Sequence, residues 1–484
     1  MNKYIFLFVS IIFTHEMSFA QESSVWDIKK CVDYALENNL NVKQSYSNVQ
    51  IDEISLHQTR MNRLPSLNGS ISYGSRWGRS IDPTSNLFST QQIGFTTGSL
   101  SSNVVLFGGL RNSYSISQSE KFLESTKYSY DAERNNVILN VVTFYTNVIL
   151  NQELYENAKA QLENTQQQLE RTKKQVDVGA LPISNLLEIQ AQAATNELNL
   201  VNQENALNLS MLQLKQVMQL SSSEIITIET PELVIENEII LEYNIDEVYA
   251  MALQTMPEIK SAESFKEANE IGTKVSKGNL YPTLSLFAGL NSNYSTAADR
   301  LRFLPDGGVN VITNPEIGYV SGTGTPVLSN SNLEVPTGQF IDGYVFMDQM
   351  NDNLSKSVSL NLNIPIFSKF FNRDEIQKSM IREEQASINL ERAKNELRQV
   401  IERAFNDVLA SAKSYSVALK QVEAREESFR VTQQRYNLGA ADYFAYQLAE
   451  TDLYRSKSDL LRMKYDFIFK KNILDFYMGN ELDY

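Results

Sequence analysis

Apolar residues recur at helical spacing through long stretches of the chain. In one stretch leucine and alanine occupy every seventh position: Leu186, Ala193, Leu200, Leu207 and Leu214. In another the apolar residues lie mostly three and four positions apart, with only Ser411 interrupting them: Leu397, Ile401, Ala404, Val408, Tyr415, Ala418 and Val422. Seven-residue repeats are typical of helices that pack as coiled coils. The pattern therefore predicts long helices in coiled-coil contact.

Segments that lack both glycine and proline indicate where these helices lie, because those residues are the poorest helix formers. Neither occurs in 21–63, 111–178, 183–230, 366–438 or 440–478. The stretch that ends at Asp177 has roughly 70 residues, which at about 1.5 Å per residue makes about 100 Å of helix. Such a helix is longer than a compact domain is wide.

Four stretches of about ten residues alternate apolar with small or polar side chains, which is typical of strands. We expect strands at about 67–80, 93–107, 283–294 and 356–367. Strands of this length span a bilayer when tilted, although strands of a soluble sandwich would look similar. Glycine, proline, asparagine and threonine are abundant in 295–355, which predicts a long exposed loop.

The second half of the chain repeats the first. Pro65 and Pro282 are 217 positions apart, whereas Gly179 and Gly439 are 260 apart, and the difference falls in the long loop. We expect two structural repeats, 21–230 and 231–484, each made of helix, strand, loop, strand, long helix, tight turn and helix. The tight turns are predicted at 178–182 and 438–442. Ser184 and Asp442 are candidates to cap the helices that follow them.

Four strands cannot close a barrel. The edge strands of an open sheet would expose unpaired backbone groups to lipid. If the strands lie in a membrane, several copies of the chain must complete the barrel together.

The N-terminus is typical of a secretory signal peptide in residues 1–20, with a basic start, a short apolar segment and small residues before cleavage at Ala20. The net charge of −15 and the pI near 4.9 argue against nucleic-acid binding. The single Cys31 excludes an internal disulfide, and His57 alone remains after cleavage. Histidine catalysis, zinc ligation and bound cofactors are therefore not expected.

Two other classes remain open. A secreted coiled-coil adhesin or a periplasmic adaptor without a membrane barrel would explain the helices but not the strand pairs. A secreted enzyme that acts through paired carboxylates is a weaker hypothesis. Pairs such as Glu426-Glu427 and Glu383-Glu384 are expected as solvated charge on helix surfaces and do not indicate catalysis. The chain also lacks a Gly-x-Ser-x-Gly hydrolase motif.

Short motifs at the strand and helix ends carry a resemblance to a known family. Leu64-Pro65-Ser66-Leu67 and Tyr281-Pro282-Thr283-Leu284 precede strands; Val105-Leu106-Phe107-Gly108-Gly109 and Ile364-Pro365-Ile366-Phe367 follow them; Gln175-Val176-Asp177-Val178-Gly179 and Arg435-Tyr436-Asn437-Leu438-Gly439 precede the turns. Taken in this duplicated order, the motifs extend the resemblance over essentially the whole mature chain. The chain resembles the TolC-like outer-membrane efflux family.

The resemblance implies a homotrimer, in which three chains supply four strands each to a twelve-stranded barrel in outer-membrane lipid. The long helices would extend the barrel as a tunnel across the periplasm. The chain would then be a passive exit duct, not an enzyme, that works with an inner-membrane transporter and a periplasmic adaptor. The turns would be the adaptor-docking tips: Val178, Gly179, Ala180 and Leu181 in the first repeat, and Leu438, Gly439, Ala440 and Asp442 in the second.

Tyrosine, arginine and carboxylate contacts close the aperture in this family, and Tyr436 matches the family tyrosine three places before glycine. Some members carry aspartates six and nine residues after the second glycine, where this chain has Ala445 and Leu448. The same offsets in the first repeat hold Asn185 and Glu188. These two residues and Tyr436 are the candidate gate residues, and a surface salt bridge is the alternative role for Glu188.

Overall fold

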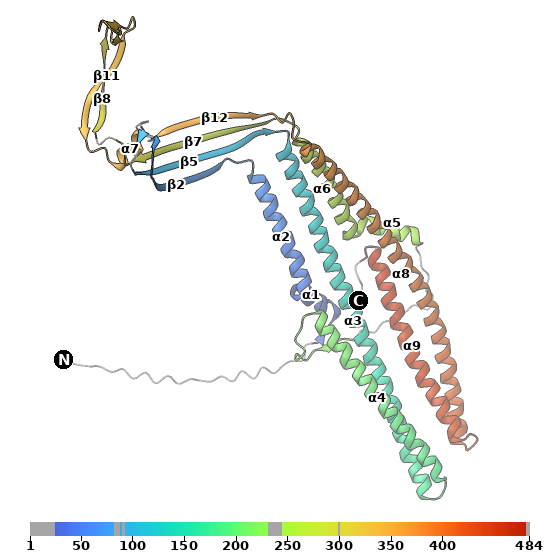
Figure 1. The fold of residues 1–484 in the computed structure, drawn as a ribbon. Helices are drawn as coiled ribbons and strands as arrows, with labels where there is room; N and C mark the ends of the chain where they lie inside the picture. Colours follow the sequence, from blue (N-terminus) through green and yellow to red (C-terminus); the bar gives the residue numbers. More distant parts are fainter. Residues whose placement is uncertain (1–24, 82–87, 90–91, 231–243, 299–300, 481–484) are drawn as a thin grey trace, which may run out of the picture. The chain divides into compact units, whose positions relative to one another are not determined.

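The computed structural model describes residues 25–81, 88–89, 92–230, 244–298 and 301–480 (Figure 1). The expected signal peptide lies outside these residues. The chain divides into two compact units: one contains residues up to 55, 119–269 and 382–484, and the other contains 56–118 and 270–381. The chain is mostly helical with a smaller share of strand, as the sequence predicts.

The helices form two sets of matching length. In the first repeat α1 (Ile28–Asn38), α2 (Leu40–Met61), α3 (Arg111–Asp177) and α4 (Ile183–Val217) have 11, 22, 67 and 35 residues. In the second, α5 (Ile245–Thr255), α6 (Pro257–Gly278), α8 (Phe371–Asn437) and α9 (Tyr443–Tyr477) have the same four lengths. The repeat seen in the sequence is thus a repeat of secondary structure.

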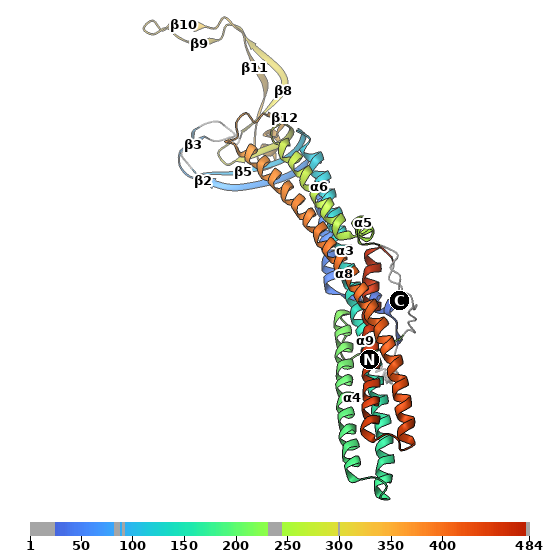
Figure 2. The same cartoon turned by 90° about the vertical axis from the view of Figure 1, so that its right-hand side faces the viewer.

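In the first unit α3 pairs with α4 and α8 with α9 (Figure 2). One apolar cluster centres on α3, where Val141 and Val148 are fully buried, and it includes Trp26 of the short strand β1 (Val25–Trp26). That strand pairs in parallel with β6 (Thr227–Ile228). A second cluster contains the apolar stripe of α8, in which Ile401 and Val408 are fully buried. Ser411 also lies in this buried stripe, and its hydroxyl donates to the Val408 carbonyl 3.0 Å away.

The second unit contains a four-stranded antiparallel sheet in the order β12-β7-β5-β2 (Figure 1). Its strands are β2 (Ser66–Arg76), β5 (Ile93–Gly108), β7 (Thr283–Ser295) and β12 (Ser355–Asn363). β2 ends at Arg76, four residues before the predicted bound of 80. β12 ends at Asn363, four residues before the predicted bound of 367. The last strand stops at Asn363 because Pro365 follows, and proline cannot donate to a ladder.

Pairing registers give this sheet one mainly apolar face and one mainly polar face. Leu286 lies opposite Leu360 on one side and Val104 on the other. Cross-strand partners point to the same face, so this face is apolar. The adjacent positions form the other face, where Ser285 lies opposite Asn361. Among the described residues β2 and β12 have no pairing partner on their outer sides.

The prediction of a loop throughout 295–355 is wrong. This segment contains a hairpin of β8 (Leu301–Ile312) and β11 (Leu333–Asp342), a smaller pair of β9 (Glu316–Tyr319) and β10 (Pro326–Leu328), and the helix α7 (Phe346–Asp352). Apolar residues on both strands, such as the contacting pair Phe303 and Phe340, favour strand pairing here. The high content of glycine and proline concealed that signal. A further short pair joins β3 (Ser80–Ile81) to β4 (Phe88–Ser89).

No helix in the described ranges has both the length and the apolar character that crossing a membrane requires.

Candidate functional site

The two tight turns predicted at glycine have nearly the same backbone geometry. Gly179 and Gly439 have φ angles of 76° and 75°, in the left-handed region that favours glycine. At the first turn the Ala180 amide donates to the Gln175 carbonyl at 2.8 Å; at the second, the Ala440 amide donates to the Arg435 carbonyl at 2.7 Å. This bonding closes the C-terminus of α3 and of α8 with a Schellman motif. A Cβ atom added to either glycine would meet nothing within 4 Å, so backbone conformation alone selects glycine.

The helices that follow these turns begin differently. Asp442 is the N-cap of α9, and its side chain accepts a 2.8 Å hydrogen bond from the Ala445 amide, as the sequence predicts. The prediction that Ser184 caps α4 is wrong, because the N-cap is Pro182, two residues earlier, and α4 begins at Ile183. Ser184 is therefore the second residue of α4, inside the first helical turn. Its hydroxyl donates to the Asn185 side chain. Proline has no side-chain acceptor, so α4 has no side-chain cap.

Both turns present apolar side chains to solvent. Val178 is 79% exposed and Leu438 is 84% exposed. The other predicted tip residues, Ala180, Leu181 and Ala440, are exposed or half-buried around them. Large apolar side chains at this exposure are unusual unless they contact another surface.

Tyr436 lies behind the second turn in an aromatic cluster. Its ring centroid is 5.0 Å from that of Tyr446 and 6.3 Å from that of Tyr443. Ile189 of α4, which is 1% exposed, packs in the same cluster together with Leu169 of α3. The cluster thus joins the α3–α4 pair to the α8–α9 pair near their turns.

A chain of polar contacts runs alongside this cluster. Gln447 of α9 donates to the side chain of Gln192 on α4, and Gln192 donates to Asn196 at 2.9 Å. Asn196 in turn donates to the hydroxyl of Thr165 on α3 at 2.8 Å. Asn196 is 4% exposed and Thr165 is 1% exposed, so these groups depend on one another for hydrogen bonds. Thr172, about two turns further along α3, has a buried hydroxyl without a partner in the described chain.

Glu450 is the functional candidate that the sequence reading missed. It is 7% exposed, and burial raises the pKa of its carboxyl to about 7, although a hydrogen bond with Tyr446 partly opposes this shift. Its charge in turn raises the pKa values of Tyr446 and Tyr454, for which burial is the larger cause. The signal in the sequence was a carboxylate in the buried stripe of α9, between Tyr446 and Leu453.

The other two gate candidates lie on α4. Glu188 is exposed and makes no ion pair within the described chain, so its alternative role in a salt bridge is not seen. Its charge contributes, as the smallest cause, to the raised pKa of Tyr443, which burial mainly determines. Asn185 is half-buried, and its backbone N–H donates to the Pro182 carbonyl at 3.2 Å. The structure therefore brings Tyr436 into the packed cluster and leaves Glu188 at its margin.

Across the described residues no three histidine, cysteine, aspartate or glutamate side chains come together as a metal site. Cys31 is buried, which raises the pKa of its thiol to about 12. The side chains of the aromatic cluster pack the α3–α4 pair against the α8–α9 pair.

Comparison with known proteins gives consistent matches. The family model described as outer membrane efflux protein matches residues 31–218 and 248–480, most of the chain. The outer membrane protein TolC of Escherichia coli (strain K12) is 22% identical over 344 residues, covering 71% of this chain. The match spans 61% of that relative's length, so the chain covers about three fifths of it.

Solved structures share the fold. A structure of CusC has a TM-score of 0.71 at 17% identity, and the match covers 94% of this chain and 92% of CusC. The outer membrane protein VceC of Vibrio cholerae has a TM-score of 0.68 at 14% identity, with 94% and 97% covered.

Proposed function

The chain belongs to the outer membrane efflux protein family, and from this premise we propose that it forms a passive exit channel for substrates delivered by an inner-membrane transporter and a periplasmic adaptor. As a member of this family the protein is located in the cell outer membrane, with its helices in the periplasm. The family consists of efflux channels and not of enzymes.

The observation that carries the proposal is the four-stranded sheet with one apolar face and two unpaired edges. An apolar face suits lipid, and unpaired edges are too costly in lipid to remain open. Three copies that pair edge to edge would provide twelve strands, an even number within the range of closed bacterial barrels. The Ser and Asn face would then line the lumen.

The turns are proposed as the adaptor-docking tips. Val178 and Leu438 are exposed apolar side chains on rigid backbone, which is what an apolar contact surface requires. The aromatic cluster around Tyr436 and the polar chain through Gln192 are proposed to hold the two helix pairs together in the closed state. Opening would separate these pairs, and its free energy would come from the partner, since a channel can only shift between its own conformations.

The proposal is tested by extracting the full-length protein from outer membranes with detergent. Native mass spectrometry is expected to give a trimer, and planar-bilayer recordings are expected to give ion-conducting pores. A monomer that stays in solution without detergent and forms no pores would contradict the proposal and favour a coiled-coil adhesin or adaptor.

A further inference from the structure

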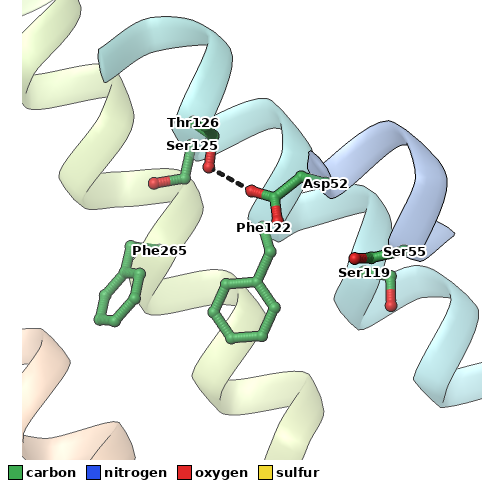
Figure 3. A pocket seen from close by; sticks show the side chains of 7 residues that line it. All are labelled: Asp52, Ser55, Ser119, Phe122, Ser125, Thr126 and Phe265. Carbon is green, nitrogen blue, oxygen red and sulfur yellow. Dashed lines mark hydrogen bonds between the residues drawn. The ribbon is translucent and has the colours of Figure 1, made fainter. Parts of the chain in front are cut away.

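A pocket of about 210 Å³ lies among α2, α3 and α6, away from the turns and the aromatic cluster (Figure 3). Seven residues line it: Asp52, Ser55, Ser119, Phe122, Ser125, Thr126 and Phe265. The rings of Phe122 and Phe265 have centroids 5.7 Å apart and meet at a tilt of 58°. The pocket therefore combines two aromatic faces with a carboxylate and several hydroxyl groups.

Contacts between the three helices hold the pocket walls in place. Ser125 of α3 donates to the Ser261 carbonyl of α6 at 2.9 Å, and the Ser261 hydroxyl donates back to the Ser125 carbonyl at the same distance. Lys127 of α3 and Glu53 of α2 form an ion pair at 3.2 Å. A ligand would thus meet a largely preformed site, which lowers the ordering free energy of binding.

Asp52 is the only ionisable side chain among the lining residues. The Thr126 hydroxyl donates to its Oδ2 at 2.6 Å and fixes the carboxylate, as the dashed line in Figure 3 shows. Within the described chain Asp52 has no ion-pair partner, and its Oδ1 accepts no hydrogen bond. The nearby Lys121 is occupied elsewhere, because Glu124 and Glu267 each lie 2.8 Å from its ammonium nitrogen. A half-buried carboxylate beside two aromatic rings is therefore left without a cation.

We infer that this pocket binds a small organic cation that carries an aromatic or alkyl group. The ammonium group would approach Asp52 Oδ1 and the rings of Phe122 and Phe265, because the face of an aromatic ring attracts a cation. The hydroxyl groups would accept its remaining N–H bonds. The site is built within one chain and does not depend on the proposed export function.

Benzylammonium is a suitable probe, and benzyl alcohol is its neutral counterpart of similar shape. Isothermal titration of the full-length protein in nanodiscs is expected to show saturable benzylammonium binding. Asp52→Asn keeps the acceptor for Thr126 but removes the charge, so affinity is expected to fall by about tenfold or more. Benzyl alcohol is expected to bind the wild-type protein about tenfold or more weakly than benzylammonium does.

Two further variants separate the pocket from general charge and folding effects. Phe122→Leu is expected to weaken benzylammonium binding several-fold by removing one ring. Glu37→Gln, which changes an exposed carboxylate of α1 outside the pocket, is expected to leave affinity unchanged. Absence of saturable binding to the wild type, equal affinity in Asp52→Asn, or equal affinity for benzyl alcohol would each overturn the inference, whatever the result of the pore recordings.

Discussion

Gln168 of α3 donates a hydrogen bond from Nε2 to the Tyr436 hydroxyl of α8, 3.1 Å away and 268 positions along the chain. Gln168 is 8% exposed, so its amide has few alternative partners. The contact joins the two helix pairs just behind their turns. In the proposed channel it therefore opposes separation of these pairs.

Tyr436→Phe removes this hydrogen bond and leaves the Gln168 amide without its partner. The closed state is expected to lose about 1–3 kcal/mol, so single-channel conductance in planar bilayers should rise. Adding Gln168→Leu should change conductance little further, because the pair acts as a unit. Tyr415→Phe on the same helix is the matched control, since the Tyr415 ring stacks on Phe467. An equal rise in conductance in Tyr415→Phe would show that the Gln168–Tyr436 hydrogen bond does not specifically stabilise the closed state.

Gly439→Val places a β-branched residue at a φ angle of 75°. A left-handed conformation costs roughly 1–2 kcal/mol for ordinary residues, and the turn is expected to rearrange. Export measured as resistance or substrate release should then be lost while the protein reaches the outer membrane at normal levels. Gly439→Asn is the matched control, because asparagine tolerates this conformation, and it should retain more export. Normal export by Gly439→Val would count against the docking role of the turn.

Asp442→Ala removes the side-chain cap of α9. The first turn of α9 is expected to lose about 1 kcal/mol of stability, seen as faster hydrogen exchange at the Ala445 amide that Asp442 now holds. Ser184→Ala changes the residue that the sequence predicted as the cap of α4, and it is the control. It should leave exchange at the start of α4 unchanged, because Ser184 does not cap that helix. A similar increase in both variants would mean that the two turns are capped alike.

The two repeats show what the sequence could and could not provide. The glycine turns and the helices between them could be predicted from the sequence, because both depend on local residue types. Glycine favours a left-handed turn, and a long segment without proline favours a helix. The cap of α4 was missed because Pro182 and Asp442 are equivalent positions with different chemistry. Glu450 was missed because a residue's burial depends on neighbouring helices far away in the sequence. The hairpin β8–β11 was missed because its glycines and prolines outweighed its alternation.

Leu286→Arg places a charge on the apolar face of the sheet. If that face contacts lipid, the change costs roughly 2–4 kcal/mol near the middle of the bilayer. Trimer levels in outer-membrane fractions should fall, and Leu362→Arg should behave in the same way. Ser285→Arg is the matched control, because its side chain lies on the opposite, polar face, opposite Asn361. Normal trimer levels in Leu286→Arg would mean that the apolar face is not exposed to lipid.

Glu450 makes the packing around Tyr446 sensitive to pH. Burial raises the pKa of its carboxyl from an ordinary 4.5 to about 7 in the folded protein. The titratable groups that sense its charge are Tyr443, Tyr446 and Tyr454. Between about pH 4.5 and pH 7 the Glu450 carboxyl keeps its proton in the folded state but releases it in the unfolded segment. Stability of this region is therefore highest below about pH 4.5, falls as the pH rises, and levels off above about pH 7.

Glu450→Gln keeps a neutral group of the same shape and should abolish this dependence. Raising the pH from 5 to 8 is expected to destabilise the wild-type region by an amount on the order of 3 kcal/mol relative to the variant. Hydrogen exchange of the α9 segment around Tyr446 and Leu453 measures local opening, and comparing both proteins at each pH cancels the intrinsic exchange rates. The two proteins should match at pH 5, and the wild type should exchange faster at pH 8. Equal exchange at both values would show that the Glu450 carboxyl is solvated in the assembled protein.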